Sequence, residues 1–216
     1  MNSRADAIGI FGGTFNPVHY GHLRLAEDVR EEFSLGSVIF IPSRIPPHKE
    51  IKPGIDPARR LAMVESAIGG NPSFHCDDVE IRRGGVSYTI DTVEYVYGAY
   101  EFAGKPFFIL GSDLLADLGT WKDIGRLLER VTFIVLLRGG VSAGEALSLA
   151  RPLERFLGKG ESIGDHFLFS SGRKIDITSS EIREKVAGGK SIRYLVPDGV
   201  LSYIEEHGLY GKGQRA

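Results

Sequence analysis

The residues whose chemistry is easiest to interpret are two histidines that follow a glycine-rich turn near the N-terminus. Residues 11–22 read FGGTFNPVHYGH. The paired glycines let the backbone turn sharply and come close to a ligand, and a helix that begins near His19 would direct free N–H groups at an anion. His19 and His22 are three positions apart, so they share one helix face and could both donate to phosphate oxygens. We therefore predict a phosphate site here.

Other interpretations of this segment are weaker. The glycines could form only a tight turn, and the histidines could be surface residues or metal ligands. Zinc usually takes three or four protein ligands, and no cysteine or third histidine has matching spacing. The segment also differs from G-x-G-x-x-G and from the P-loop, because no G-K-[ST] follows it.

The elements that must position these residues alternate between short apolar strands and helices. Alternation of this kind, with continuous apolar strands, predicts a parallel sheet covered by helices on both faces. Ligands of such sheets bind beyond the carboxyl ends of the strands. The expected strands are 7–11, 38–41, 74–81, 107–110, 131–137 and 166–169. The expected helices are 19–33, 57–68 (with Asp56 as its cap), 89–100, 112–118, 124–129, 145–157, 179–187 and 197–207.

A proline-rich segment, PSRIPPHK at 42–49, follows the second predicted strand. Proline lowers the entropy of a loop that must settle over a ligand. His48 and Lys49 offer positive charge to a phosphate, and Arg44 is a further candidate contact. The alternative is a solvated loop with incidental cations.

Two later segments place polar or aromatic residues beside expected strand ends and helix starts. Thr89 is a predicted N-cap. Asp113, after Gly111, could accept hydrogen bonds from ribose hydroxyls or could cap a helix. Trp121 is the only tryptophan, and its plane suits a flat ring, although a lone tryptophan is more often part of the core.

The segment 177–183, ITSSEIR, opens a helix near the C-terminus. Thr178 and Glu181 match a capping box, which is a complete structural explanation. Arg183, one turn later, suits bidentate binding of a phosphate.

Taken together, these motifs resemble the HxGH nucleotidyltransferase superfamily, and the long first motif resembles its nicotinate-nucleotide adenylyltransferases. The resemblance runs from residue 8 to residue 210, although residues 139–171 contribute little to it. It implies a Rossmann-like α/β fold, a doubly wound parallel sheet with helices on both faces. We expect a single domain over residues 1–216, with a small helical portion from about 178 to 210.

The resemblance also implies a reaction and roles for individual residues. The reaction is transfer of AMP from ATP to nicotinate mononucleotide, giving deamido-NAD and pyrophosphate in NAD biosynthesis. The family's motif histidines engage ATP phosphates, the turn at Thr89 holds the nicotinate carboxylate through main-chain amides, and a tryptophan at the place of Trp121 stacks on the pyridine ring. The family pattern here is Ile-Ser-Ser-Thr-x-Ile-Arg. This chain has Thr178 in place of the first serine and Ser180 in place of the threonine, so both positions keep a hydroxyl.

The predicted site residues fall into three groups. The catalytic residues are His19, His22 and Arg183. The other ATP-binding residues are Gly12, Gly13, Thr14, Phe15, Gly111, Asp113, Ile177, Thr178, Ser179 and Ser180. The substrate-binding residues are Asn16, Arg44, His48, Lys49, Thr89, Trp121 and Lys122.

The implied chemistry requires positioning more than proton transfer. The attacking 5′-phosphate is already anionic and pyrophosphate leaves readily, so the task is to bring two charged groups into line. Mg²⁺ is the expected cofactor, held mainly through ATP phosphates and water. No metal ligands on the protein are predicted, and the segment HCDD at 75–78 is a weak candidate because alternate strand residues face opposite ways.

Length, charge and composition limit the classes of protein to which this chain can belong. The length of 216 residues suits one α/β domain. The net charge of -2 disfavours a protein whose main task is binding a nucleic-acid polymer. The single cysteine, Cys76, favours a reducing compartment. The longest apolar run, Val131–Leu137, is far shorter than the ~20 residues of a membrane helix, and residues 1–7 do not resemble a signal peptide. We expect a cytoplasmic protein with no membrane partner, and a homo-oligomer is possible.

Three alternatives to nicotinate mononucleotide adenylation stay open at this point. The acceptor could be nicotinamide mononucleotide or phosphopantetheine, although Trp121 and the proline-rich loop favour a pyridine nucleotide. A non-catalytic nucleotide-binding module is the third alternative. Such a module could lose the histidines or Arg183, and this chain keeps them.

Overall fold

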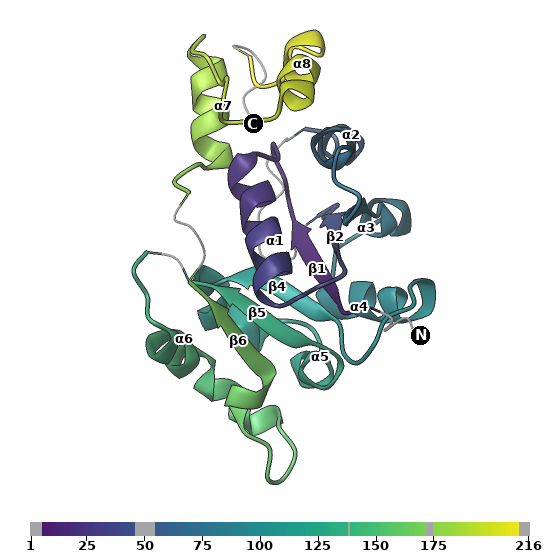
Figure 1. The fold of residues 1–216 in the computed structure, drawn as a ribbon, viewed down its shortest axis with the longest axis vertical. Coiled ribbons are helices and arrows are strands. Elements are labelled where there is room, and N and C mark those ends of the chain that lie inside the picture. Colours follow the sequence, from purple (N-terminus) through teal and green to yellow (C-terminus); the bar gives the residue numbers. More distant parts are fainter. Residues whose placement is uncertain (1–5, 46–54, 138, 172–174, 212–216) are drawn as a thin grey trace.

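A six-stranded parallel sheet forms the centre of the protein (Figure 1). The computed structural model describes residues 6–45, 55–137, 139–171 and 175–211. The strand order is β3-β2-β1-β4-β5-β6, so the order reverses between β1 and β4. The strands are β1 (Ile8–Gly13), β2 (Ser37–Pro42), β3 (Phe74–Cys76), β4 (Phe107–Gly111), β5 (Thr132–Leu136) and β6 (Phe167–Ser170). This topology confirms the predicted doubly wound sheet.

Helices cover both faces of the sheet, and each face has its own apolar core. One core joins the sheet to α1, α2, α7 and α8, and the other joins it to α3, α4, α5 and α6. The strands supply both cores because their side chains alternate between faces. The α-helices are α1 (Tyr20–Glu32), α2 (Pro57–Ile68), α3 (Val79–Arg83), α4 (Thr89–Ala99), α5 (Ile124–Arg130), α6 (Ala143–Ala150), α7 (Ser179–Ala187) and α8 (Asp198–Glu206). The 3-10 helices are η1 (Ser112–Thr120), η2 (Arg151–Phe156) and η3 (Ile163–His166).

Local capping explains where several helices begin. Asp56 accepts a hydrogen bond from the Ala58 N–H at 2.9 Å and Pro57 takes the first helical position, as the sequence predicts. Thr178 likewise accepts from the Glu181 N–H at 3.1 Å, so α7 begins at the predicted residue. Each bond satisfies an N–H group that has no partner within the helix.

Three sequence predictions need correction. The strand expected at 74–81 ends at Cys76, because the Asp77 carboxylate accepts the Val79 N–H at 2.8 Å and starts α3 instead. Thr89 is the first residue of α4 and not its cap, which is Tyr88. The helix expected at 145–157 divides into α6 and η2, because Pro152 lacks the N–H that a continuing α-helix needs.

The C-terminal helices lie together at the top of the molecule in Figure 1, beyond α1 and α2. Val200 and Leu201 of α8 and Ile182 of α7 are buried in the core that contains α1 and α2. Within the described ranges, no helix combines the length and the apolar character that crossing a membrane would require.

Candidate active site

The predicted histidine pair lies at the start of α1. His19 is the N-cap of the helix and is 5% exposed, and His22 belongs to the first turn. Their ring centroids are 3.7 Å apart and the rings are inclined by 32°. The spacing prediction is confirmed, since both rings occupy one face of the helix start.

Gly21, between the two histidines, explains how the rings come so close. A Cβ at position 21 would lie 2.9 Å from His19 Nδ1 and 3.5 Å from the Ile177 carbonyl oxygen. Real side chains avoid contacts this short, so only glycine leaves room for the His19 ring against the helix. Phe15 packs on the other side of His22, with ring centroids 5.2 Å apart. Position 21 therefore sets the geometry of the pair.

The turn between β1 and α1 is held by residues distant in the sequence. Arg60 of α2 donates to the Thr14 carbonyl at 2.6 Å, and Arg183 of α7 donates to the Asn16 carbonyl at 2.7 Å. Ser179 donates to the Pro17 carbonyl at 2.9 Å. Buried carbonyl groups need such partners, and together these bonds fix the turn that presents the histidines.

Arg60 also joins this turn to the segment after β2. Its second Nη donates to the carbonyls of Ser43 and Arg44 at 2.7 Å and 3.3 Å. The side chain is 3% exposed, and burial lowers the pKa of the guanidinium while Tyr210, Asp56 and Glu80 oppose that shift. A charged group in this position concentrates positive potential behind the turn between β1 and α1.

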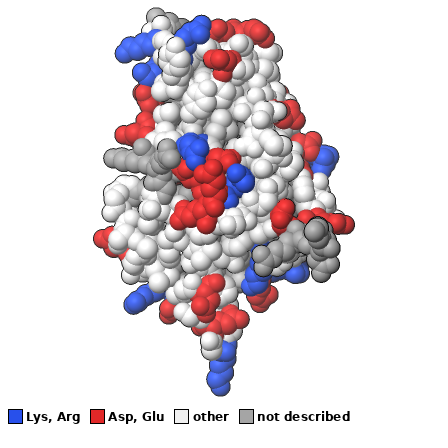
Figure 2. All heavy atoms as spheres, in the orientation of Figure 1, with Lys and Arg blue, Asp and Glu red and all other residues white. Residues whose placement is uncertain are grey.

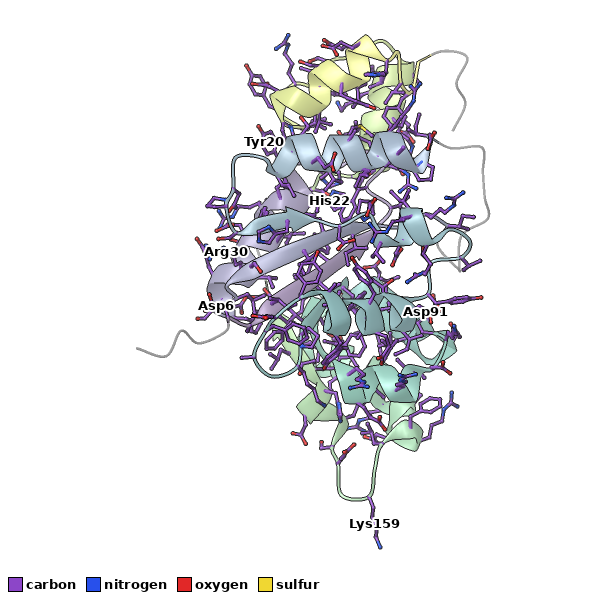
Figure 3. The ribbon with its side chains drawn as sticks, turned by 90° about the vertical axis from the view of Figure 1, so that its right-hand side faces the viewer. Asp6, Tyr20, His22, Arg30, Asp91 and Lys159 are labelled. Atoms are coloured by element: carbon purple, nitrogen blue, oxygen red, sulfur yellow. The ribbon has the colours of Figure 1, made fainter. Side chains whose placement is uncertain are left out.

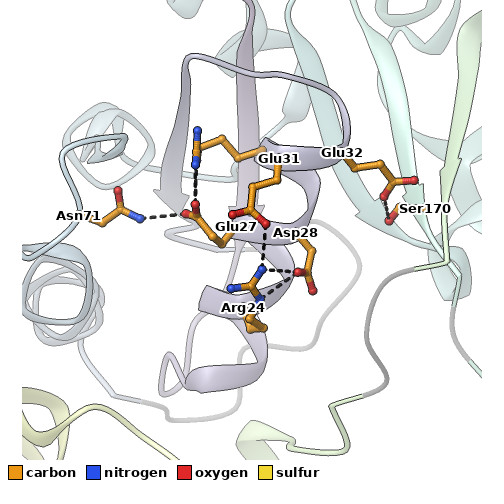
Figure 4. Close-up of polar contacts among 8 residues, drawn as sticks. Arg24, Glu27, Asp28, Glu31, Glu32, Asn71 and Ser170 are labelled. Atoms are coloured by element: carbon orange, nitrogen blue, oxygen red, sulfur yellow. Dashed lines mark hydrogen bonds and ion pairs between the residues drawn. The ribbon is translucent and has the colours of Figure 1, made fainter.

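The outer face of α1 is held by polar contacts. Figure 2 shows charged side chains gathered in the middle of this face, over α1. Arg24 pairs with Asp28 and Glu31, and Glu27 accepts from Arg30 and Asn71 (Figure 4). Most of these contacts are half-buried and lie at the surface of the protein, where ion pairs stabilise a helix only modestly. At the end of α1, Glu32 accepts from Ser170 of β6 at 2.5 Å, which ties the helix to a neighbouring strand end.

Two cavities open at the carboxyl edge of the sheet. The first has a volume of about 610 Å³ and lies between the start of α1, the ends of β5 and β6 and the start of α7. His19, His22, Ile177, Thr178 and Ser179 line it. The wall also contains residues that the sequence did not single out, and these are Leu25, Leu136, Leu137, Gly139, Gly140, Val141, Ser170, Ser171, Ile175 and Asp176.

The second cavity has a volume of about 370 Å³ and lies at the reversal point between β1 and β4. Its wall includes the glycine turn, the start of α4 and the segment that carries Trp121. His22 lines this cavity as well as the first one. The sheet separates α1 from α4, as the positions of His22 and Asp91 show in Figure 3, and the second cavity reaches both helices around the strand ends.

Most predicted site residues line one of these cavities, but the predicted ATP set is divided. Ile177, Thr178 and Ser179 line the first cavity. Nine other predicted site residues line the second cavity, and these are Gly12, Gly13, Thr14, Phe15, Thr89, Gly111, Asp113, Trp121 and Lys122.

Asn16, Arg44, Ser180 and Arg183 are not among the residues that line either cavity. Arg183 bonds to the Asn16 carbonyl and, at 3.1 Å, to the Ser180 hydroxyl. Arg44 donates to the Ile81 carbonyl at 3.0 Å.

His48 and Lys49 lie outside the described residues. Their predicted contact with substrate stays a prediction.

Aromatic and charged groups define one side of the second cavity. Trp121 packs edge-on against Phe108, with ring centroids 5.9 Å apart. Lys122 bonds to Asp91 at 3.0 Å and lies 4.7 Å from the centre of the Tyr88 ring. A flat aromatic plate beside an ammonium group suits a planar ring with an anionic substituent.

The sequence analysis did not identify some of the residues that build the site. Arg60, Tyr210 and Glu80 act across long sequence separations, and no local pattern marks them. Tyr210 donates to Asn16 Oδ1, and burial raises the pKa of its phenol, which keeps the donating form. Gly21 had a signal, because a glycine between two histidines on a helix is otherwise unfavourable.

Among the described residues, no group of three or more His, Cys, Asp or Glu side chains is arranged to hold a metal ion. Asp77, in the weak metal candidate at 75–78, instead accepts from Tyr100 at 2.6 Å. The donor set at the histidine pair is two imidazoles with hydroxyls and main-chain amides nearby, which suits phosphate oxygens better than Mg²⁺.

Comparison with known proteins adds independent findings. Residues 10–185 match the model of the family described as cytidylyltransferase-like. A protein of Syntrophotalea carbinolica named probable nicotinate-nucleotide adenylyltransferase is 42% identical over 217 residues, covering 97% of this chain and 99% of its own length. A protein of Geotalea uraniireducens with the same name is 41% identical and covers 94% of this chain and 97% of its own length.

Solved structures have the same fold. The Plasmodium falciparum nicotinic acid mononucleotide adenylyltransferase complexed with NaAD has a TM-score of 0.70 and 20% identity, covering 95% of this chain and 97% of its own. The same enzyme complexed with APC has a TM-score of 0.69 over the same shares of the two chains.

Proposed function

The chain belongs to the cytidylyltransferase-like family and, within it, to the nicotinate-nucleotide adenylyltransferases, and from that premise we propose that it transfers the adenylyl group of ATP to nicotinate mononucleotide. The products are deamido-NAD and pyrophosphate. The observation that carries this proposal is the position of His22, which lies in the walls of both cavities. A group transfer between two nucleotides needs a point where their binding sites meet.

ATP is assigned to the first cavity. Its wall contains the start of α7, where Thr178 offers a hydroxyl that can donate, and the start of α1 with its histidine pair. Helix starts and hydroxyls bind phosphates well. The wall continues to the ends of β5 and β6, which provides room for the nucleoside part of ATP.

Nicotinate mononucleotide is assigned to the second cavity. Trp121 supplies a plate for the pyridine ring, and the first turn of α4 brings main-chain amides near the ring's carboxylate. Asp113 lines the same cavity, where its carboxylate could accept hydrogen bonds from the ribose of this nucleotide. For Gly111 and Asp113 this proposal replaces the expected contact with ATP by one with the mononucleotide.

The chemical step is a direct phosphoryl transfer. An oxygen of the mononucleotide 5′-phosphate attacks the α-phosphorus of ATP, the bond from that phosphorus to the bridging oxygen breaks, and the electron pair leaves with pyrophosphate. No general base is required, because the attacking phosphate is already anionic. His19 and His22 stabilise charge that builds on the α-phosphate in the transition state.

Arg183 is proposed to act on the leaving pyrophosphate. Its bonds to the Asn16 carbonyl and the Ser180 hydroxyl use one N–H on each Nη, and a guanidinium carries further donors. The bond to the Asn16 carbonyl also fixes the turn, so the residue has a positioning role in addition. Mg²⁺ bound by the triphosphate would neutralise part of its charge, and in this proposal the protein itself binds ATP oxygens and not the metal.

A pyrophosphate-release assay with ATP and Mg²⁺ tests the function. Nicotinate mononucleotide, nicotinamide mononucleotide and phosphopantetheine are compared as acceptors at equal concentrations. We expect the highest kcat/KM with the nicotinate compound. Release with phosphopantetheine alone, or release with no acceptor dependence, would contradict the proposal.

A further inference from the structure

A buried carboxylate, Glu80 of α3, lies in the wall of the second cavity. Its side chain is 7% exposed. The predicted reaction gives it no task, because no proton has to be taken from either substrate. A carboxylate that loses water needs compensating hydrogen bonds, so its partners indicate what it does.

The partners of Glu80 come from both sides of the α4 start. The Thr92 hydroxyl donates to Glu80 Oε1 at 2.6 Å, and the Ser87 hydroxyl lies close enough to the same carboxyl to lower its pKa. Ser87 immediately precedes the N-cap Tyr88, and Thr92 lies in the first turn of α4. Glu80 therefore holds the segment 87–92 through Thr92 at one end and interacts with Ser87 at the other.

Further bonds extend from these two hydroxyls. Arg83 donates to the Thr92 hydroxyl at 3.1 Å. The Arg44 N–H donates to the Ser87 hydroxyl at 2.9 Å, and the Ser87 N–H donates to the Ile45 carbonyl at 2.9 Å. Through Ser87 the carboxylate is thus connected to the segment after β2.

The segment 87–92 forms part of the cavity wall. Tyr88 and Thr89 line the cavity between the two anchored hydroxyls, and Tyr88 gives α4 no side-chain cap. Amides of a first helical turn without a side-chain cap can be satisfied by a ligand. Their direction depends on the anchors, since a turn held at both ends has little freedom to tilt.

We infer that Glu80 is a positioning residue that fixes the segment 87–92 and thereby sets the selectivity of the second cavity for the ring substituent of the mononucleotide. The inference rests on the proposed function for the identity of that ligand. Burial raises the pKa of the Glu80 carboxyl, with the Thr92 and Ser87 hydroxyls opposing the shift.

Three variants test the inference. Glu80→Ala removes both acceptors, and Glu80→Gln keeps one carbonyl oxygen. Glu94→Gln is the matched control, because Glu94 lies on α4 and pairs with Arg126 and Arg130 at 3.1 Å each. It removes a carboxylate of the same helix that does not line the second cavity.

Binding is measured by fluorescence of Trp121, the only tryptophan, during titration with nicotinate or nicotinamide mononucleotide in the absence of ATP. For Glu80→Ala we expect the Kd of the nicotinate compound to rise about tenfold, as for the loss of a buried hydrogen-bond partner. The Kd of the nicotinamide compound should rise less, and Glu80→Gln should recover part of the loss. In turnover assays KM for ATP should stay within about twofold.

Amide hydrogen exchange provides a readout without ligand. Residues 87–92 should exchange faster in Glu80→Ala than in the parent, and not in Glu94→Gln, because the anchors that limit local opening are gone. Unchanged exchange, or equal changes in Kd for both mononucleotides, would overturn the inference. If the parent binds nicotinate mononucleotide but releases no pyrophosphate with ATP, the proposed function fails while the titrations still decide the role of Glu80.

Discussion

The Tyr210 hydroxyl donates a 2.7 Å hydrogen bond to Asn16 Oδ1, joining two residues that are 194 positions apart. Asn16 lies in the turn that leads to the histidine pair, and Tyr210 is 3% exposed near the end of the described chain. The C-terminal helices therefore contribute directly to the geometry of the site. The bond also gives Asn16 a structural task in addition to its predicted contact with substrate.

Tyr210→Phe should reduce both stability and turnover. It leaves the Asn16 oxygen without this donor, and such a loss costs about 1–3 kcal/mol. We expect a lower Tm and a several-fold lower kcat, measured by thermal unfolding and pyrophosphate release. Tyr203→Phe in α8 is the control, because Tyr203 belongs to the same C-terminal part of the chain but stacks on His207, whereas Tyr210 bonds to Asn16. Equal effects of the two variants on Tm and kcat would show that the Tyr210 hydroxyl has no specific role in the active site.

His22→Ala should have the largest effect on turnover. The residue lies where the two cavities meet, and removing one donor that stabilises transition-state charge typically costs ~10²–10³ in kcat. The fold should persist, because His22 is only partly buried. His75→Ala, at an exposed position of β3, is the matched control and should retain normal kcat. A folded His22→Ala enzyme with unchanged kcat would remove this side chain from the mechanism.

Gly21→Ala tests the close approach of the His19 ring. Alanine is usually the better helix residue, by roughly 0.5–1 kcal/mol, but here its Cβ would lie 2.9 Å from His19 Nδ1. We expect the ring to be displaced and kcat to fall with little gain in Tm. Gly98→Ala in α4 meets no atom within 4 Å, so it should raise Tm and leave kcat unchanged. Normal turnover in Gly21→Ala would show that the ring position is not critical.

The sequence predicted those parts of the site that depend on neighbouring residues. The His19–His22 pair, the Asp56 and Thr178 caps and the apolar strands follow from local spacing, and the structure contains all of them. The strand expected at 74–81 was wrong because the Asp77 side chain satisfies a main-chain N–H and starts a helix within an otherwise strand-like run.

The contacts that assemble the site could not be predicted from local spacing in the sequence. Arg60, Glu80 and Tyr210 bond to groups 12 or more positions away in the chain. Their partners are defined only when the sheet brings the segments together. The division of the predicted ATP residues between two cavities is likewise a property of topology, because β1 and β4 are separated in sequence and adjacent at the reversal point.

Acid should lower the stability that Glu27 gives to α1, the helix that carries the histidines, and a Glu27 variant tests this. The hydrogen bond from Arg30 lowers the pKa of the Glu27 carboxyl below its ordinary value of 4.5; burial opposes this shift in part, and the bond from Asn71 adds to it. Because the folded-state pKa is lowered, the stabilisation by this carboxylate is present above the unfolded pKa and is lost as pH falls through the folded pKa. Glu27→Gln should therefore be less stable than the parent at pH 7, and the difference should shrink below pH 4.5.

Urea unfolding at several pH values measures that difference, and a second variant identifies its source. In an Arg30→Gln background the main partner of Glu27 is gone, so Glu27→Gln should change stability less and with a weaker dependence on pH. This double-mutant comparison isolates the coupling between the two side chains. If the parent and Glu27→Gln lose stability in parallel as pH falls, in both backgrounds, the lowered pKa of Glu27 does not contribute to the acid response of α1.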